Sequence, residues 1–412
     1  MNTTQTKKLP AFGEFIIILS LLMSLTALSI DTVLPALSQI SRDLAVEKQN
    51  DRQLVISIIF LGQAIGQLYF GPLSDSTGRK RAIYAGYALF LIGSLISGFA
   101  GSFSIMLAGR TLQGIGVSAP RGVSLALVRD LYEGRTMARV MSFATMVFIL
   151  VPTIAPSLGQ GILAFTGWRA IFVFYILFAV VSIFWFSFRM PETLAKEDRI
   201  PFTWKRIKES IREIMKIRSV LGFTIASGLI YGIFIGYLNS SQQIFQEQYG
   251  LGELFPLYFS SIALSLGTAA FMNSRLVMRF GMRKLVHWAL RVQTALSGIF
   301  VLAVIILEGQ PPLWSLMVFL MMFFFCTGLL FGNINALAMQ PLGKLAGIGS
   351  GVVGSFSTMI SMLLGTVVGR SYNGTILPLI VGMIILTAGS ILIVHWATAS
   401  QHLPSGIQHA GD

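Results

Sequence analysis

Residues 71–81 read GPLSDSTGRKR and join two apolar runs, residues 53–73 and 82–100. The segment holds two glycines, which permit a tight turn, and one acid, Asp75, among three basic residues. A run of about 20 apolar residues is long enough to cross the hydrocarbon of a bilayer as a helix. The segment therefore predicts two transmembrane helices that meet at a short charged turn on one membrane surface.

The same pattern extends over the whole chain of 412 residues, of which 54% are hydrophobic and only 11% are charged. A soluble domain has about a quarter of its residues charged, so the composition excludes a soluble globule. We expect one transmembrane helix from each of twelve apolar runs. They cover residues 12–37, 53–73, 82–100, 104–128, 137–163, 168–188, 219–243, 254–278, 285–307, 312–338, 346–369 and 375–398.

The net charge of +13 does not indicate a nucleic-acid partner, because the basic residues lie in the gaps between the apolar runs. With a cytoplasmic N-terminus, 23 of the 30 lysines and arginines fall in cytoplasmic segments. This bias predicts that both termini are cytoplasmic. The chain has one cysteine, Cys326, so it can build neither a disulfide framework nor a thiolate metal cluster, and we expect no metal site.

The longest polar stretch, residues 189–218, divides the chain into two sets of six runs. It predicts an N-terminal bundle over residues 1–188, a linker over 189–218, and a C-terminal bundle with a short tail over 219–412. Apolar side chains recur at helical spacing in the linker, which indicates an amphipathic helix on the anionic inner leaflet or a solvated basic linker. These side chains are Trp204, Ile207, Ile211, Ile214 and Met215.

A weak internal repeat supports the division into two halves. Residues 274–284, SRLVMRFGMRK, follow the eighth run as the opening segment follows the second. Gly78 aligns with Gly281, whereas Asp75 aligns with Met278. Two related halves imply a central cavity on a pseudo-twofold axis, the plan of many secondary transporters. The predicted fold is an all-α membrane protein with twelve transmembrane helices in two pseudo-symmetric six-helix bundles.

Several motifs resemble those of the major facilitator superfamily, and in particular its bicyclomycin-resistance (Bcr/CflA) branch of drug:proton antiporters. The resemblance covers essentially the whole chain and implies an alternating-access exporter of small organic molecules in the bacterial inner membrane. It implies no cofactor, inward proton flow as the driving force, and a monomer. The motifs are GPLSDSTGRKR (71–81), LAGRTLQGIGVSA (107–119), VPTIAPSLGQG (151–161), LSIDTVLPALSQI (28–40), VRDLYEGRTMARVMSFATM (128–146) and MPET (190–193).

The opening segment is the candidate cytoplasmic gate. Its carboxylate, Asp75, can bind a helix N-terminus and pair with Arg129 or Arg139 at neighbouring helix ends. The resemblance implies the start of the eleventh helix, near Gly347 to Gly351, as its partner; the alternative is a plain topogenic turn. The candidate gate residues are Gly71, Asp75, Gly78, Arg79, Lys80, Arg129 and Arg139.

The fifth run carries the candidate antiporter motif, formed by Pro152, Pro156 and Gly159. Proline removes a backbone donor and kinks a helix, and glycine lets a neighbouring helix pack closely. The match to the family is incomplete, because the family's glycine-proline step reads Ala155-Pro156 here.

Asp31 is the one acid that sits within an otherwise apolar run. A carboxylate there costs about 3 kcal/mol on insertion scales, so such residues usually face a cavity. Burial and an approaching cation act on its protonation in opposite directions, so a structural change can load or release a proton. We expect Asp31 to carry the coupling proton, in competition with substrate or with Arg110. The alternative is a structural acid near the outer helix end.

Arg110 and Arg121 lie eleven positions apart in the fourth run, which places both on one helix face, about 16 Å apart along the axis. This face also holds Gln113 and is too polar for lipid, so it should line the cavity. Arg121 can alternatively snorkel to the inner surface.

The second half offers uncharged polar groups among many aromatic and methionine side chains, which suit a roomy apolar pocket that tolerates varied ligands. The predicted substrate-binding residues are Asp31, Arg110, Gln113, Arg121, Tyr231, Tyr237 and Asn333. The chain has neither an ATP-binding loop nor a catalytic constellation, so we expect a transporter and not an enzyme. The predicted function is proton-coupled efflux of small amphipathic compounds. The alternatives are proton-coupled transport of one anionic metabolite, such as a siderophore or amino-acid derivative, and a transporter-like receptor.

Overall fold

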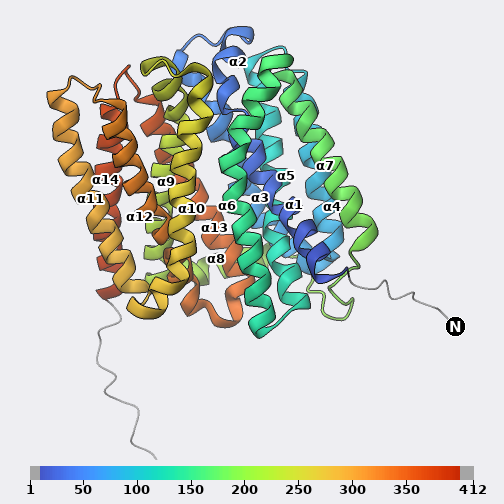
Figure 1. The fold of residues 1–412 in the computed structure, drawn as a ribbon. Helices are drawn as coiled ribbons and strands as arrows, with labels where there is room; N and C mark the ends of the chain where they lie inside the picture. Colours follow the sequence, from blue (N-terminus) through green and yellow to red (C-terminus); the bar gives the residue numbers. More distant parts are fainter. Residues whose placement is uncertain (1–9, 400–412) are drawn as a thin grey trace, which may run out of the picture.

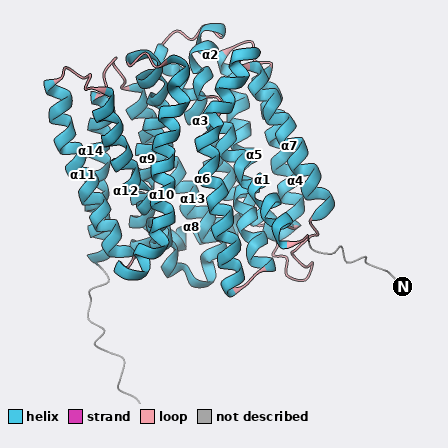
Figure 2. Cartoon of the chain, viewed as in Figure 1, coloured by secondary structure: helices cyan, strands magenta, loops and turns pink. Residues whose placement is uncertain are grey.

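The computed structural model describes residues 10–399, except for the side chains of 135, 138, 142, 144–149, 344 and 346. This part of the chain is almost entirely helical, and most of its helices are joined by short loops, the longest loop being residues 190–203 (Figures 1 and 2). The twelve long helices are α1 (Phe12–Asp31), α3 (Leu54–Thr77), α4 (Arg79–Gly98), α5 (Phe103–Leu131), α6 (Gly134–Phe165), α7 (Arg169–Arg189), α9 (Arg218–Gln242), α10 (Phe255–Phe280), α11 (Met282–Ile306), α12 (Leu313–Met339), α13 (Ala346–Arg370) and α14 (Leu377–Ala399).

Ten helices of the described chain are long and apolar enough to cross a membrane. The remaining two long helices are α5, which carries Arg110 and Arg121, and α6, whose described apolar part is Leu150–Phe165. α5 packs on α1 and α3, and α6 packs on α1, in the same bundle (Figure 1). The predicted all-helical membrane fold of twelve transmembrane helices is confirmed.

The twelve helices form two six-helix bundles that stand side by side (Figure 1). The first half contains α1 and α3 to α7, and the second contains α9 to α14. The halves meet where α3 packs on α13 and α6 packs on α10. We call the end of the molecule at which α8 (Trp204–Lys216) lies the α8 end, and the opposite end, with α2 (Leu37–Asp43), the α2 end.

The internal repeat has a structural counterpart in two identical turns. Gly78 joins α3 to α4 with φ 102° and ψ 157°, and Gly281 joins α10 to α11 with φ 79° and ψ 151°. Only glycine adopts this region readily, because a Cβ atom would clash with the backbone. The aligned glycines therefore make the same sharp reversal at the α8 end of both halves.

The apolar run that begins at Phe12 is interrupted within the structure. α1 ends at Asp31, and the chain continues through one 3₁₀ turn, Leu34–Ala36, into α2. Pro35 lies in this turn, and its missing N–H prevents a regular helix from continuing. The break places Asp31 at a helix C-terminus rather than in the middle of a straight helix.

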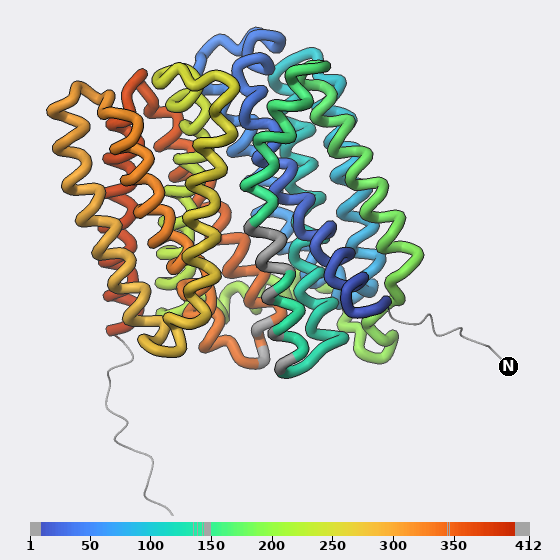
Figure 3. The backbone as a smooth tube through the Cα atoms, in the orientation of Figure 1, coloured from blue at the N-terminus to red at the C-terminus, as the bar shows by residue number. Residues whose placement is uncertain are grey.

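The linker forms the amphipathic helix α8, but protein covers most of its apolar face. Ile207 and Ile214 are buried, and α8 packs on α9 and α13. Trp204 is exposed and stacks edge-on with Phe202. α8 therefore lies against the second half at the α8 end, and Figure 3 shows this part of the chain behind the front helices.

Candidate functional site

Asp31 is buried between the two halves. It is 4% exposed, and no hydrogen bond or ion pair reaches its carboxylate from the residues that the structure describes. The hydroxyls of Tyr175 in α7 and Tyr237 in α9 lie within electrostatic reach of it. The Tyr237 hydroxyl is itself buried and lacks a hydrogen-bond partner in the described chain. A carboxyl group of the first half and a phenol of the second half thus lie buried in the same region, and neither has a hydrogen-bond partner among the described residues.

Gly159 of the candidate antiporter motif lies directly beside this site. A Cβ atom at Gly159 would clash with the backbone of Thr32, the residue that follows Asp31. α6 is continuous through Pro152 and Pro156, and it packs on α1 and on the turn after it. The motif therefore brings α6 into direct contact with the end of α1.

Arg110 is fully buried and makes three hydrogen bonds. Its Nε donates to the Val55 carbonyl at 2.9 Å, and its two terminal nitrogens donate to the Ser29 carbonyl at 2.8 Å and Gln113 Oε1 at 2.9 Å. Gln113 in turn donates to Ser94 Oγ at 2.7 Å. Backbone carbonyls of α1 and α3, rather than a carboxylate, thus solvate the guanidinium.

The predicted competition between Arg110 and the proton at Asp31 has no direct contact to support it. Arg110 forms no ion pair with Asp31 within the described chain. It instead holds the carbonyl of Ser29, two residues before Asp31. Arg110 therefore fixes the helix turn that carries the acid.

Arg121 is partly buried and lies at the contact between the halves. Its guanidinium donates to Gln63 Oε1 in α3 at 3.5 Å and interacts with the Tyr231 hydroxyl in α9. Tyr231 stacks on Phe331 of α12. Of the two orientations considered for Arg121, the structure has the inward one.

The other two predicted second-half residues differ in what they contact. Tyr237 packs against Phe259 and Phe324 with its hydroxyl toward the first half. Asn333 is engaged within its own half, because its amide donates to Asn273 Oδ1 at 2.7 Å and to the Leu329 carbonyl at 2.8 Å.

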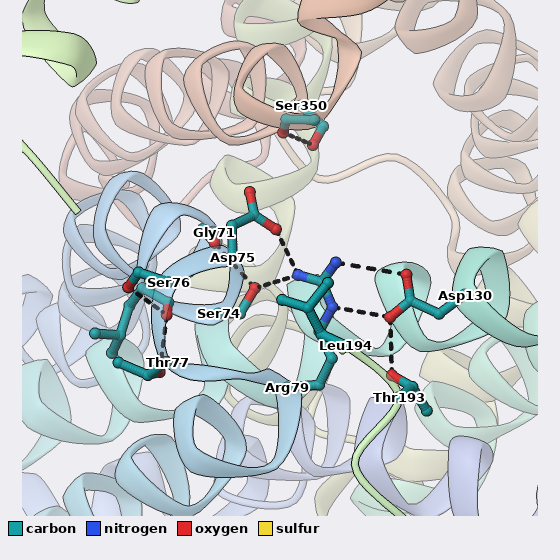
Figure 4. Close-up of polar contacts among 12 residues, drawn as sticks. Gly71, Ser74, Asp75, Ser76, Thr77, Arg79, Asp130, Thr193, Leu194 and Ser350 are labelled. Atoms are coloured by element: carbon teal, nitrogen blue, oxygen red, sulfur yellow. Dashed lines mark hydrogen bonds and ion pairs between the residues drawn. The ribbon is translucent and has the colours of Figure 1, made fainter. Parts of the chain in front are cut away.

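The candidate gate at the α8 end is organised around Arg79. Its guanidinium binds Asp75 at 2.5 Å and Asp130 at 2.9 Å, and it donates a hydrogen bond to Ser74 Oγ at 2.9 Å (Figure 4). Asp130 additionally accepts a hydrogen bond from Thr193. This network joins α3, α4 and α5, all within the first half.

The sequence-based pairing of Asp75 with Arg129 or Arg139 is not observed. Arg129 is exposed in the last turn of α5, and the Arg139 guanidinium lies over the Phe12 ring at 5.0 Å. Asp75 does lie near the start of α13, since it lines a small pocket together with Ile348. Figure 4 shows Ser350 of α13 above Asp75.

Glu192 of the MPET motif is a structural partner of the gate that the sequence did not reveal. Its two carboxylate oxygens accept hydrogen bonds from the backbone N–H groups of Arg79 at 2.8 Å and Lys80 at 3.1 Å. Lys80 Nζ reciprocally donates to the carbonyls of Ser187 and Met190. A carboxylate thus caps the start of α4, and an ammonium caps the end of α7.

A second network, which sequence reasoning missed, joins the two halves at the α2 end. Arg52, which is 3% exposed, binds Glu247 at 2.6 Å and Ser38 Oγ at 2.9 Å. Gln242 also donates to Ser38 at 2.7 Å. Glu247 lies in one turn of π-helix, Gln243–Gln248, a rare geometry that often marks functional positions.

Further bonds extend this α2-end network toward the surface. Gln243 donates to Asn50 at 2.8 Å and accepts from Gln53, and Arg370 of α13 binds Asp51 at 2.5 Å. An open pocket of about 720 Å³ lies over them. The positions of these residues in the sequence did not predict their contacts. Gln243 and Asn50 are about 190 positions apart, and Arg370 and Asp51 are 319 positions apart.

Comparison with known proteins agrees with this architecture. The model of the Major Facilitator Superfamily matches residues 19–366. A bicyclomycin resistance protein homolog of Haemophilus influenzae is 28% identical over 386 residues, which cover 93% of this chain and 96% of that protein. Multidrug resistance protein D of Escherichia coli K12 is 25% identical over 368 residues, covering 84% of this chain and 89% of that protein.

Solved structures give the same fold. The Escherichia coli xylose transporter XylE, in a partially occluded inward-open conformation, has a TM-score of 0.71 at 13% identity, covering 97% of this chain and 99% of that chain. The human organic anion transporter MFSD10 has a TM-score of 0.70 at 17% identity, covering 94% and 100%. This chain is therefore a multi-pass membrane transporter that belongs to the major facilitator superfamily.

Proposed function

We propose that the chain is a proton-coupled antiporter that exports small amphipathic organic compounds by alternating access across the bacterial inner membrane. The observation that carries the proposal is Asp31, an acid enclosed between the halves without a partner in the described chain. Burying an unpaired charge is costly, so the charge state of Asp31 must depend on whether the halves enclose it. Rocking of the bundles would then load or release a proton.

The relatives support the direction and the substrate class. Proteins named for bicyclomycin resistance and multidrug resistance match along most of the chain. Resistance by a transporter follows when it exports the toxic compound. A driving force of ~150 mV supplies about 3.5 kcal/mol per proton, which limits the gradient of a neutral compound to roughly 300-fold.

The remaining assignments follow from this mechanism. The α8 end is cytoplasmic by the distribution of basic residues, and the Arg79 network would stabilise that side. Residues 1–188 and 219–412 would rock as units about the linker 189–218. We expect the monomer to be the transporting unit, as in the single-chain relatives of this fold.

Proteoliposomes with an internal pH dye test the proposal. Addition of drug should drive proton movement with the natural chain, and Asp31→Asn should abolish it while drug binding stays within about threefold. Glu197→Gln, which neutralises an exposed linker acid, serves as the matched control. Drug-driven proton movement that persists in Asp31→Asn would refute coupling through this residue.

Transport of one anionic solute is the second candidate. It is favoured by Arg121, whose guanidinium lies at the contact between the halves beside Tyr231. Neutralising Arg121 should then abolish transport of that solute and spare neutral drugs.

A further inference from the structure

Three helices bring hydrogen-bond donors together around Arg121. The guanidinium comes from α5, the Gln63 amide from α3, and the Tyr231 hydroxyl from α9 of the other half. This cluster is separate from the Arg110 site, because eleven residues of an α-helix separate the two backbone positions by about 16 Å along the axis. It therefore forms its own point of positive charge between the halves.

Gln63 shows that the cluster has unused donor capacity. The residue is 1% exposed, and its Oε1 accepts from Arg121 while its Nε2 finds no acceptor among the described residues. A buried donor without an acceptor costs about 1–3 kcal/mol. The Gln63 side chain uses its Oε1 as an acceptor for Arg121, and the Nε2 group of the same amide remains able to donate. An acceptor-bearing ligand would remove that cost.

An aromatic wall borders the same donors. The rings of Tyr231 and Phe331 stack with centroids 4.1 Å apart and planes 4° apart, and Phe234 meets Phe331 edge-on at 5.9 Å. Rigid stacked rings offer a flat apolar surface for a planar group. The guanidinium and the amide donor complement a carboxylate, and the aromatic face complements a planar ring. The three groups together therefore suit an aromatic carboxylate.

We propose that Arg121, Gln63 and Tyr231 form a subsite for the carboxylate of a planar aromatic compound, whose ring lies against Tyr231 and Phe331. A guanidinium binds a carboxylate through two parallel hydrogen bonds, and the Gln63 amide supplies a further donor. The proposal rests on the proposed transport of small organic compounds but not on proton coupling. Binding to purified protein therefore tests it separately from the experiment on Asp31.

The probes are nalidixic acid and its methyl ester, which differ in the charge of one group. Binding is measured with the full chain in detergent. The natural protein should bind the acid more tightly than the ester. Arg121→Gln should weaken binding of the acid by about tenfold or more and of the ester by less than about twofold. Gln63→Leu should weaken acid binding by about threefold to tenfold.

Two further variants keep the test sharp. Arg121→Lys keeps the charge but loses the planar fork, so it should bind the acid with intermediate affinity. Arg291→Gln removes an exposed guanidinium from α11, which packs on α12 and α14, and should leave both affinities unchanged. The proposal is refuted if the natural protein does not prefer the acid, or if Arg121→Gln affects acid and ester equally.

Discussion

Arg110 shows how a single residue can determine the geometry of a site without touching the reacting group. Its side chain bonds to carbonyls of Ser29 and Val55 and so ties α1 and α3 to α5. The planar fork reaches these acceptors in fixed directions, which the compact ammonium of lysine does not reproduce. The position of Asp31, two residues after Ser29, depends on this tie.

Arg110→Lys should therefore destabilise the protein and disturb coupling together. We expect a loss of about 1–3 kcal/mol for each buried group left unpaired, seen as a lower midpoint of thermal unfolding in detergent. Drug-driven proton movement should fall as well. Arg291→Lys, an exposed change on α11, is the control. An unchanged melting midpoint in Arg110→Lys would show that the three hydrogen bonds do not hold the helices together.

At the level of elements, the turn between α3 and α4 combines two demands on one glycine. Gly78 has a positive φ of 102°, and a Cβ atom there would lie 2.6 Å from Glu192 Oε2, the carboxylate that caps α4. Both the backbone conformation and the cap therefore exclude a side chain.

Gly78→Ala should lower stability by about 1–3 kcal/mol, measured by thermal unfolding. Two control variants at other glycines distinguish the cost of the backbone conformation from the cost of the clash with Glu192. Gly281→Ala has the same backbone conformation but no neighbour within 4 Å, so it should show only the backbone cost. Gly71→Ala, inside helix α3 with free space around it, should show no loss. Equal melting midpoints for Gly78→Ala and Gly71→Ala would refute this account of the turn.

The helices themselves were predictable because each one is a long apolar run bounded by polar residues. The expected run 219–243 and the observed α9, Arg218–Gln242, illustrate how closely the boundaries agree. The broken end of α1 was missed, since hydropathy does not register the turn that Pro35 imposes. The burial of the linker helix was also missed, because an apolar face suits either lipid or protein.

Side-chain partners were harder to predict than helices. Asp31 and Arg121 stood out because charges in a span are costly, which needs no knowledge of neighbours. The pairing of Arg79 with Asp130 and the cap by Glu192 depend on how segments distant in the sequence meet in space. Glu247 was passed over because an acid at the end of a run looks solvated, although it binds the buried Arg52.

Across the whole molecule, the two polar networks differ in what they join. The Arg79 network at the α8 end lies within the first half, whereas the pair Arg52 and Glu247 at the α2 end bridges the halves. Alternating access requires the halves to separate at one end at a time. The bridging pair therefore holds the α2 end closed, and the proposed release of substrate at that end requires it to break.

Glu247→Gln should shift the molecule toward opening at the α2 end. With Glu247 partly exposed, a loss of about 1 kcal/mol, or about a fivefold change in the population ratio, is expected. Glu47 and Glu253 are each replaced by cysteine and spin-labelled in a Cys326→Ser background. Double electron–electron resonance between the labels then measures the distance between the halves. In Glu247→Gln, a larger fraction of molecules should show the longer distance between the labels than in the protein with Glu247.

The exchanged pair, Arg52→Glu with Glu247→Arg, should restore the shorter distances, because the attraction is re-formed with the charges reversed. Glu308→Gln, a change of an exposed acid at the same end, is the matched control and should leave the distribution unchanged. If Glu247→Gln and the control give the same distribution, the pair does not bias the α2 end. Closure would then rest on the other contacts between the halves at that end, which include the ion pair of Arg370 with Asp51 and the packing of α3 on α13.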